Sequence, residues 1–231
     1  MQIHGFNKTT LLDYPGRVAA TIFMGGCNFR CPFCQNGDLA LYPERQAVIS
    51  KEEIFAFLKK RKGLLTGVCI TGGEPTLSKD LEEIIGEIKD IGYQIKLDTN
   101  GYRPEVIAKL LEKQLLDYIA MDMKNSSEKY RETAGISFLD IGKIRESIHT
   151  IMESGICYEF RTTMVKEFHK KEDMRLIGEE IRGAEAYFLQ GYQESERVIM
   201  SGLHSYTKKE MEELAEEIAP YVKRAEIRGI R

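Results

Sequence analysis

Three cysteines crowd one short segment of the chain. The segment reads Gly26-Cys27-Asn28-Phe29-Arg30-Cys31-Pro32-Phe33-Cys34, so three and then two residues separate the cysteines. Three thiolates at this spacing can bind three irons of a cubic iron–sulfur cluster, which ordinarily takes four cysteine ligands. No fourth cysteine lies close in sequence, so one iron would keep an open coordination position. An open position admits a substrate to the metal directly, which is typical of a catalytic centre rather than a structural one.

A zinc knuckle and three unrelated thiols are the alternative interpretations of this segment. A structural zinc site needs a fourth Cys or His close by, and His4 is the only nearby candidate. Five cysteines, an odd number with three in one loop, do not fit a disulfide framework. Cys69 and Cys157 lie in apolar stretches, where we expect them to be small buried side chains.

Short β-rich apolar runs alternate with longer amphipathic runs, the pattern of βα units that build a parallel sheet. The predicted strands are residues 18–24, 67–70, 94–97, 118–121, 157–163 and 186–189. Helices are predicted to begin at Ser50 and Thr207, each followed three residues later by a glutamate in a capping-box pattern. The other predicted helices are residues 81–91, 104–113, 141–154 and 172–181. A short run, Ala225–Arg228, is a candidate for a final strand.

Polar segments follow the first four predicted strands directly. They are the cysteine loop, Thr71-Gly72-Gly73-Glu74-Pro75, Asp98-Thr99-Asn100-Gly101 and Asp122-Met123-Lys124. In parallel α/β folds the chemistry collects at the carboxyl ends of the strands, so we expect these segments to meet at one mouth. Arg161 alternates with apolar neighbours on the fifth strand and should face the same mouth. It needs an anion there, either a bound carboxylate or an ion pair with Glu159 or another barrel carboxylate.

Length and composition favour a single domain over residues 1–231. The chain has no Pro/Gly/Ser-rich linker, and its hydrophobic (42%) and charged (30%) fractions are ordinary globular values. A net charge of −3 and a pI near 5.9 give no electrostatic case for a nucleic-acid partner. No apolar run approaches the length of a membrane span and no secretory signal is visible. We therefore expect no membrane partner and a cytoplasmic location.

The cysteine loop, with aromatic Phe33 before its last cysteine, and the Gly-Gly-Glu segment together resemble the radical S-adenosylmethionine (SAM) superfamily. The resemblance implies an α/β fold, a partial (β/α)6 TIM-like barrel of the radical SAM type. It also implies a 4Fe–4S cluster on three cysteines, with SAM chelating the open iron through its amine and carboxylate. The cluster ligands implied are Cys27, Cys31 and Cys34. The SAM contacts implied in these two motifs are Phe33, Gly72, Gly73 and Glu74, the last accepting hydrogen bonds from the SAM ammonium.

Two later segments are similar to motifs of glycyl radical activating enzymes. Asp98-Thr99-Asn100-Gly101 resembles their "D-[ST]-N-G" segment, and Asp122-Met123-Lys124 resembles a "D-x-K" segment whose lysine contacts the SAM carboxylate. The resemblance thus implies further SAM contacts at Asp98, Asn100, Lys124 and Arg161. It also implies a candidate monovalent-cation site, made by Asp98, Thr99, Asp122 and the carbonyl of Met123.

Residues 5–16 resemble the opening segment of anaerobic ribonucleoside-triphosphate reductase activating proteins, and with the other motifs the resemblance covers nearly the whole chain. It implies an oxidoreductase that reductively cleaves SAM to a 5'-deoxyadenosyl radical. That radical removes a hydrogen atom from a glycine of a partner glycyl radical enzyme, in an anaerobic or facultative host, with flavodoxin or ferredoxin as electron donor. Gln35 stands where many such activases have His, and the roles of Gln35, Gln190 and His204 stay open.

Two other functions are compatible with the cysteine loop. A radical SAM enzyme acting on a small molecule, similar to 7-carboxy-7-deazaguanine synthase, needs a closed pocket where a macromolecular substrate needs a groove. The shape near residues 190–204 should discriminate between these two. A non-enzymatic iron–sulfur electron-transfer module is the third candidate, but it has no need of Glu74, Asp122 or Lys124.

Overall fold

An eight-stranded open sheet forms the centre of the protein, in a computed structural model that describes residues 2–230. The strands are β1 (Ile3–Thr10), β2 (Ala19–Met24), β3 (Gly67–Gly72), β4 (Gln94–Thr99), β5 (Tyr118–Asp122), β6 (Cys157–Met164), β7 (Tyr187–Gly191) and β8 (Ala225–Arg228). They lie in chain order, with β1 antiparallel to β2 and every later pair parallel. The predicted α/β partial barrel is confirmed, including the final strand β8.

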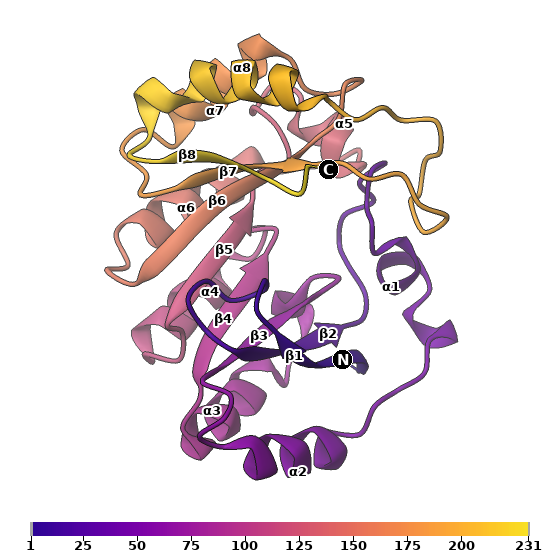
Figure 1. Cartoon of the computed structure of the whole chain (residues 1–231), viewed down its shortest axis with the longest axis vertical. Helices are drawn as coiled ribbons and strands as arrows, with labels where there is room; N and C mark the ends of the chain where they lie inside the picture. Colours follow the sequence, from indigo (N-terminus) through magenta and orange to yellow (C-terminus); the bar gives the residue numbers. More distant parts are fainter. Residues whose placement is uncertain (1, 231) are drawn as a thin grey trace.

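Long helices lie along the outer side of this sheet (Figure 1). They are α2 (Lys51–Arg61), α3 (Leu81–Ile91), α4 (Pro104–Glu112), α6 (Ile141–Met152), α7 (Lys171–Glu180) and α8 (Lys208–Ile218). Shorter turns are α1 (Gly37–Leu41), α5 (Tyr130–Ala134) and the 3-10 helices Pro43–Arg45, Pro75–Leu77 and Ala219–Tyr221. Within residues 2–230, no helix is both long enough and apolar enough to cross a membrane.

The predicted helix starts are confirmed by their capping hydrogen bonds. The Ser50 side chain accepts the backbone N–H of Glu53 at 3.1 Å. Thr207 and Glu210 cap each other reciprocally, since Glu210 N–H donates to Thr207 Oγ1 and Thr207 N–H donates to the Glu210 carboxylate. Each cap satisfies backbone donors that the first helical turn leaves without a partner.

The main core lies between the sheet and its helices. Leu97 and Ile119 of the sheet are fully buried and belong to one apolar cluster with Ile85 of α3 and Ile107 of α4. Each such side chain stabilises the fold by about 1.5–3 kcal/mol through burial. Because side chains alternate along a strand, the residues between these positions face the inner side of the sheet, where polar groups gather.

Strand β1 and the loop after it were not predicted. Tyr14 in that loop is buried and packs edge-on against Tyr118, with 5.8 Å between ring centroids. Asp13 accepts a hydrogen bond from Thr21, a buried residue of β2. The loop therefore covers the amino-terminal end of the open barrel.

The prediction for Cys157 was wrong. This cysteine is exposed, whereas Cys69 is fully buried as predicted. Cys157 is the first residue of β6, at the amino-terminal end of the strand. The apolar neighbours that suggested burial are themselves buried in the strand, but its first residue is exposed to solvent.

Candidate active site

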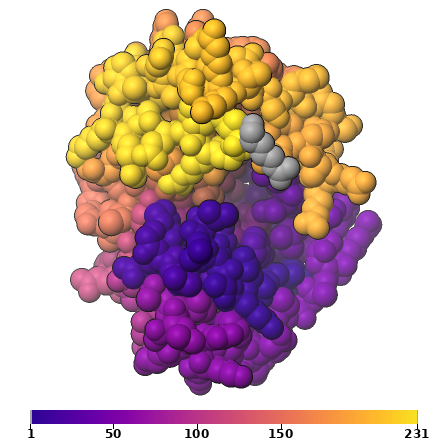
Figure 2. Space-filling view, viewed as in Figure 1, coloured from indigo at the N-terminus to yellow at the C-terminus, as the bar shows by residue number. Residues whose placement is uncertain are grey.

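A cavity of about 340 Å³ opens at the carboxyl ends of β2 to β7. Figure 2 shows the face on which the N-terminal strand and the C-terminal segments border a hollow. The predicted site residues that line the cavity are Cys27, Cys31, Phe33, Cys34, Gly72, Gly73, Asp98, Thr99, Asn100, Asp122, Lys124 and Arg161. Glu74 and Met123 are not part of this lining.

Contacts from far along the chain hold the cysteine loop in place. Arg30 N–H donates to the carbonyl of Ala134, at the end of α5, over 2.8 Å. Gly135 follows with φ +64°, and a Cβ at this position would lie 2.0 Å from the Arg30 carbonyl oxygen. Only glycine allows this approach, so α5 fixes the backbone between Cys27 and Cys31.

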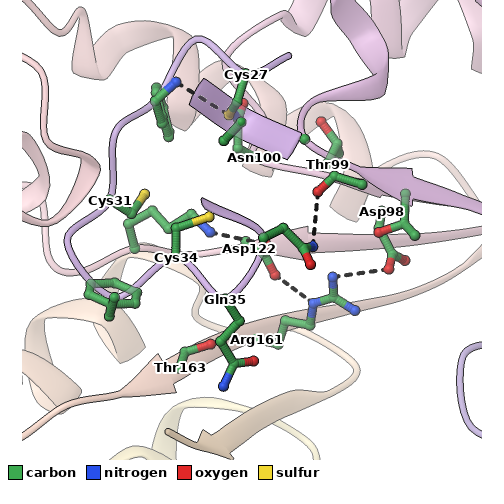
Figure 3. A pocket seen from close by; sticks show the side chains of 18 of the residues that line it. Cys27, Cys31, Cys34, Gln35, Asp98, Thr99, Asn100, Asp122, Arg161 and Thr163 are labelled. Atoms are coloured by element: carbon green, nitrogen blue, oxygen red, sulfur yellow. Dashed lines mark hydrogen bonds and ion pairs between the residues drawn. The ribbon is translucent and has the colours of Figure 1, made fainter. Parts of the chain in front are cut away.

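The three thiols face the cavity together (Figure 3). Burial raises the pKa of Cys27 to about 11 and that of Cys31 to about 12, and it also raises the pKa of Cys34. Among residues 2–230, no three His, Cys, Asp or Glu side chains gather around a single ion position. Three soft sulfur donors on one cavity match the ligand chemistry of an iron–sulfur cluster, whose positive irons stabilise thiolates that burial disfavours.

The Gly-Gly-Glu segment packs directly on the cysteine loop. Gly73 N–H donates to the Met24 carbonyl, and Glu74 N–H donates to the Gly26 carbonyl, both at 2.8 Å. A Cβ on Gly73 would lie 2.1 Å from the Gly26 carbonyl oxygen. The glycine is therefore needed for the contact between the β2 and β3 loops themselves.

Glu74 is fully buried, and both of its carboxylate oxygens accept hydrogen bonds from the protein. Oε1 accepts from Thr76 N–H at 3.0 Å and from Thr99 Oγ1 at 2.8 Å, and Oε2 accepts from Asn100 N–H at 2.6 Å. Burial raises the pKa of Glu74, and these donors act in the opposite direction. The side chain of Asn100 in turn donates to Asn28 Oδ1 at 2.8 Å. In this structure Glu74 links the β3, β4 and cysteine loops.

Arg161 lies between two carboxylates of neighbouring strands (Figure 3). Its Nη2 is 3.1 Å from Asp98 Oδ2, and its Nε is 2.5 Å from Asp122 Oδ1. Lys124 Nζ is 3.0 Å from Asp122 Oδ2. The ion-pair interpretation of Arg161 thus holds, but with Asp98 and Asp122; Glu159 instead pairs with Arg228 of β8.

These ion pairs set the protonation of the site. Burial alone would raise the pKa of Asp98, but Arg161 and then Lys96 hold it below its usual value. The pKa of Asp122 is lowered in the same way by Arg161 and Lys124, against the effect of burial. Both carboxylates are therefore ionised at neutral pH.

The residues whose roles the sequence left open lie at different distances from the cavity. Gln35 and Gln190 line it, and so does Thr163 of β6. His204 is exposed and bonds Glu167 through Nδ1 at 2.7 Å, outside the lining. Gln35 Nε2 is 3.4 Å from the Gln193 carbonyl oxygen, so the cysteine loop touches the segment after β7.

Sequence reasoning missed Thr163 and two charged residues of the site. Lys96 is only 2% exposed, and its ammonium forms a salt bridge with Asp98. Asp13, from the loop before β2, lines the cavity. A lysine in the middle of an otherwise apolar strand was the signal for Lys96, because a buried ammonium requires a partner. His169 is buried and bonds the Lys124 carbonyl through Nε2 at 2.8 Å.

Comparison with known proteins agrees with this geometry. The sequence model of the Radical SAM superfamily matches residues 21–177. A "Putative glycyl-radical enzyme activating enzyme" of Methanocaldococcus jannaschii is 34% identical over 197 residues, covering 83% of this chain and 80% of that protein. A "Probable GTP 3',8-cyclase" of Saccharolobus islandicus is 30% identical over 65% of this chain, which spans 48% of the cyclase.

Among solved structures, SuiB of Streptococcus suis bound to precursor peptide SuiA has a TM-score of 0.67 at 16% identity. The likeness covers 89% of this chain and 48% of SuiB, and it concerns the fold alone. The sequence match and the shared fold, with three cysteines on one cavity at the carboxyl ends of the strands, lead to one assignment. The chain belongs to the radical SAM superfamily, whose members bind a 4Fe–4S cluster and SAM.

Proposed function

We propose that the chain is an activating enzyme that generates a glycyl radical on a partner polypeptide. When bound, the cluster and SAM supply a 5'-deoxyadenosyl radical after one-electron reduction of the sulfonium. Cys27, Cys31 and Cys34 would hold the cluster and leave one iron open to SAM. The donor set supports this proposal, because three thiols share the cavity and no fourth cysteine lines it among the described residues.

The other cavity residues would bind and orient SAM and exclude water from it. The Asp98–Arg161–Asp122–Lys124 ion pairs fix the cationic groups that would face the SAM carboxylate. Phe33 is largely buried, lines the cavity with the cysteines and packs on Phe168 with 5.8 Å between ring centroids. Held charges of this kind need little reorganisation during reaction, which is how a protein site directs a reactive group.

The charge of the cavity supports a polypeptide substrate over a nucleotide. A second cavity of about 260 Å³ adjoins the first and shares Gln35, Thr163 and Gln190 with it. Three cations line the two cavities within residues 2–230, namely Lys124, Arg161 and Arg228, and each is already paired with a carboxylate. A triphosphate carries several negative charges beyond the single SAM carboxylate assigned to this lining, and the described residues of the two cavities offer no further cation to balance them.

Amide groups make up much of the second cavity. The side chains of Thr163 and Gln190 form no hydrogen bond with any described residue, and Gln193 also lines the cavity. Amides and hydroxyls both donate and accept, as a peptide backbone does. The activating-enzyme relative and the peptide-bound structural neighbour are consistent with such a substrate.

The test is an anaerobic electron paramagnetic resonance spectrum of the reconstituted, reduced protein with SAM and a glycyl radical enzyme from the same organism. We expect a persistent carbon-centred doublet that is lost in Cys34→Ala and kept in Cys157→Ser, a matched thiol outside the cavity. Formation of 5'-deoxyadenosine with no doublet for any glycyl radical enzyme of the organism would overturn the activase proposal.

The cyclase relative raises a small-molecule substrate as the second candidate. In the same assay, GTP in place of the partner enzyme should then support 5'-deoxyadenosine formation and be consumed. The paired state of Lys124, Arg161 and Arg228 predicts no such consumption.

A further inference from the structure

We propose that Lys96 supplies, from within the chain, the positive charge that a bound monovalent cation would bring to Asp98. The protein would then bind and cleave SAM without an alkali cation. This inference rests on the proposed function, since it concerns how the same site handles SAM. It departs from the resemblance to glycyl radical activating enzymes, which implied a cation site at Asp98, Thr99, Asp122 and Met123.

The oxygens of that implied site are already engaged by the protein. Asp98 Oδ1 pairs with Lys96 Nζ and its Oδ2 with Arg161. The two oxygens of Asp122 pair with Arg161 and Lys124. An alkali ion needs several free oxygens around it, and here each carboxylate oxygen already faces a cationic nitrogen.

The two uncharged candidates are engaged as well. Thr99 Oγ1 donates to Glu74 Oε1 at 2.8 Å and accepts from Gly101 N–H at 3.1 Å. The Met123 carbonyl accepts a hydrogen bond from Thr162 Oγ1 at 2.7 Å. The residues present therefore do not fit a bound cation.

The charge balance of the side chains around Asp98 also argues against a bound cation. Lys96, Arg161 and Lys124 carry three positive charges, and Asp98 and Asp122 carry two negative ones. Asp13 of the same cavity adds a third negative charge, so these charges already balance and a further cation would add an uncompensated positive charge to the site. Repulsion between like charges is strong where water is excluded.

Strand geometry explains why the ammonium stays beside Asp98. Lys96 and Asp98 are two residues apart on β4, so both side chains face the inner side of the sheet. Register places Lys96 beside Cys69 of β3 and Tyr118 of β5. Its ammonium lies 4.0 Å from Cys69 Sγ and 5.8 Å from the Tyr118 ring centroid. Neither neighbour carries a negative charge at neutral pH, so Asp98 is the partner that stabilises the buried ammonium.

The first experiment needs no variant and no cluster. Thermal unfolding of the apo-protein is compared in potassium, sodium and tetramethylammonium chloride at equal ionic strength, with ²³Na NMR line width as a second measure of binding. We expect the same midpoint in all three salts and no protein-induced broadening of the sodium line. Stabilisation by sodium or potassium alone would overturn the inference, whatever the enzyme proves to activate.

The variant Lys96→Met removes the ammonium and keeps most of the side-chain volume. Asp98 then has a free oxygen, and we expect potassium or sodium to raise SAM affinity at least about tenfold in this variant and under about twofold in the wild type. Lys96→Arg should stay independent of alkali ions. The double variant Lys96→Met/Asp98→Asn lacks the carboxylate charge that an alkali ion would balance, so its SAM affinity should not depend on alkali ions. It replaces the single variant in this test if Lys96→Met folds poorly.

The outcomes separate the two proposals. A wild type that cleaves SAM only with potassium or sodium present would overturn the Lys96 inference and leave the activase proposal standing. Cation independence of Lys96→Met, at unchanged SAM affinity, would also overturn it. A protein that cleaves SAM without alkali ions but forms no glycyl radical would support Lys96 and overturn the proposed function.

Discussion

Replacing Gly135 with alanine tests whether α5 shapes the cysteine loop. Gly135 has φ +64°, and a Cβ there would lie 2.0 Å from the Arg30 carbonyl oxygen. No real Cβ sits so close to an oxygen, so the loop must move. Gly155→Ala is the matched control, because Gly155 has φ +73° and nothing within 4 Å of a Cβ.

The expected change in the free energy of unfolding follows from the difference between these two glycine sites. Both alanines carry the backbone strain of a left-handed conformation, about 1–2 kcal/mol. Gly135→Ala adds overpacking of about 1–3 kcal/mol and the loss of the Arg30–Ala134 hydrogen bond, about 1 kcal/mol. The free energy of unfolding should thus fall about 2–4 kcal/mol further than in Gly155→Ala, a midpoint about 4–16 °C lower.

Thermal unfolding by circular dichroism measures this difference, since the chain has no tryptophan to report it. Iron bound per protein after anaerobic reconstitution is the second measure. Gly135→Ala should lose iron, and Gly155→Ala should retain it. Equal midpoints and equal iron contents in the two variants would refute the claim that α5 holds the loop.

Three further results are expected. The pKa of Asp98 is lowered on folding, so its stabilising effect is present above the unfolded value of about 3.9 and is lost as pH falls through the folded value; unfolding followed against pH should show a steeper acid decline in the wild type than in Asp98→Asn. Cys157 is exposed, whereas Cys27 and Cys34 are half-buried and Cys31 and Cys69 buried, so the fastest phase of reaction with a thiol reagent in the native apo-protein should be lost in Cys157→Ser; persistence of that fastest phase would contradict the assigned exposure. Gln190→Ala should weaken binding of a peptide from the partner enzyme about tenfold and leave SAM affinity unchanged, as equilibrium titration would show, whereas equal losses for both would place Gln190 with SAM instead.

The strands that carry the site were predictable because their outward faces are apolar. The prediction for β4 stopped at residue 97, since Asp98 interrupts the apolar run. In the structure Asp98 and Thr99 still pair with Ala120 and Met121, because the inward face of the strand borders a polar cavity. Strand β1 escaped prediction because Ile3–Thr10 is an edge strand, half exposed and interrupted by Gly5, with little apolar content.

The sequence predicted that the motifs meet at one mouth of the barrel. It did not predict which side chains they contact there. Arg161 pairs with Asp122 because the register sets the two residues side by side, and neither strand's sequence encodes that register. Glu74, expected to face a ligand, accepts hydrogen bonds from Thr99, the last residue of the next strand, and from Asn100, which follows it. Such contacts arise from the curvature and stagger of the sheet, which local sequence does not specify.

The supports of the cysteine loop also bear on how the protein is made. The cysteines at positions 27–34 leave the ribosome early, whereas Ala134 bonds Arg30, and Met200 N–H bonds the Pro32 carbonyl at 2.9 Å. Contacts between residues so distant in sequence form late in folding. The loop therefore takes its shape only when nearly the whole chain has been synthesised. Until then three thiols are unprotected in the nascent chain, so insertion of the proposed cluster belongs after release, and a truncated chain ending before residue 200 would lack the shaped loop that the proposed cluster needs.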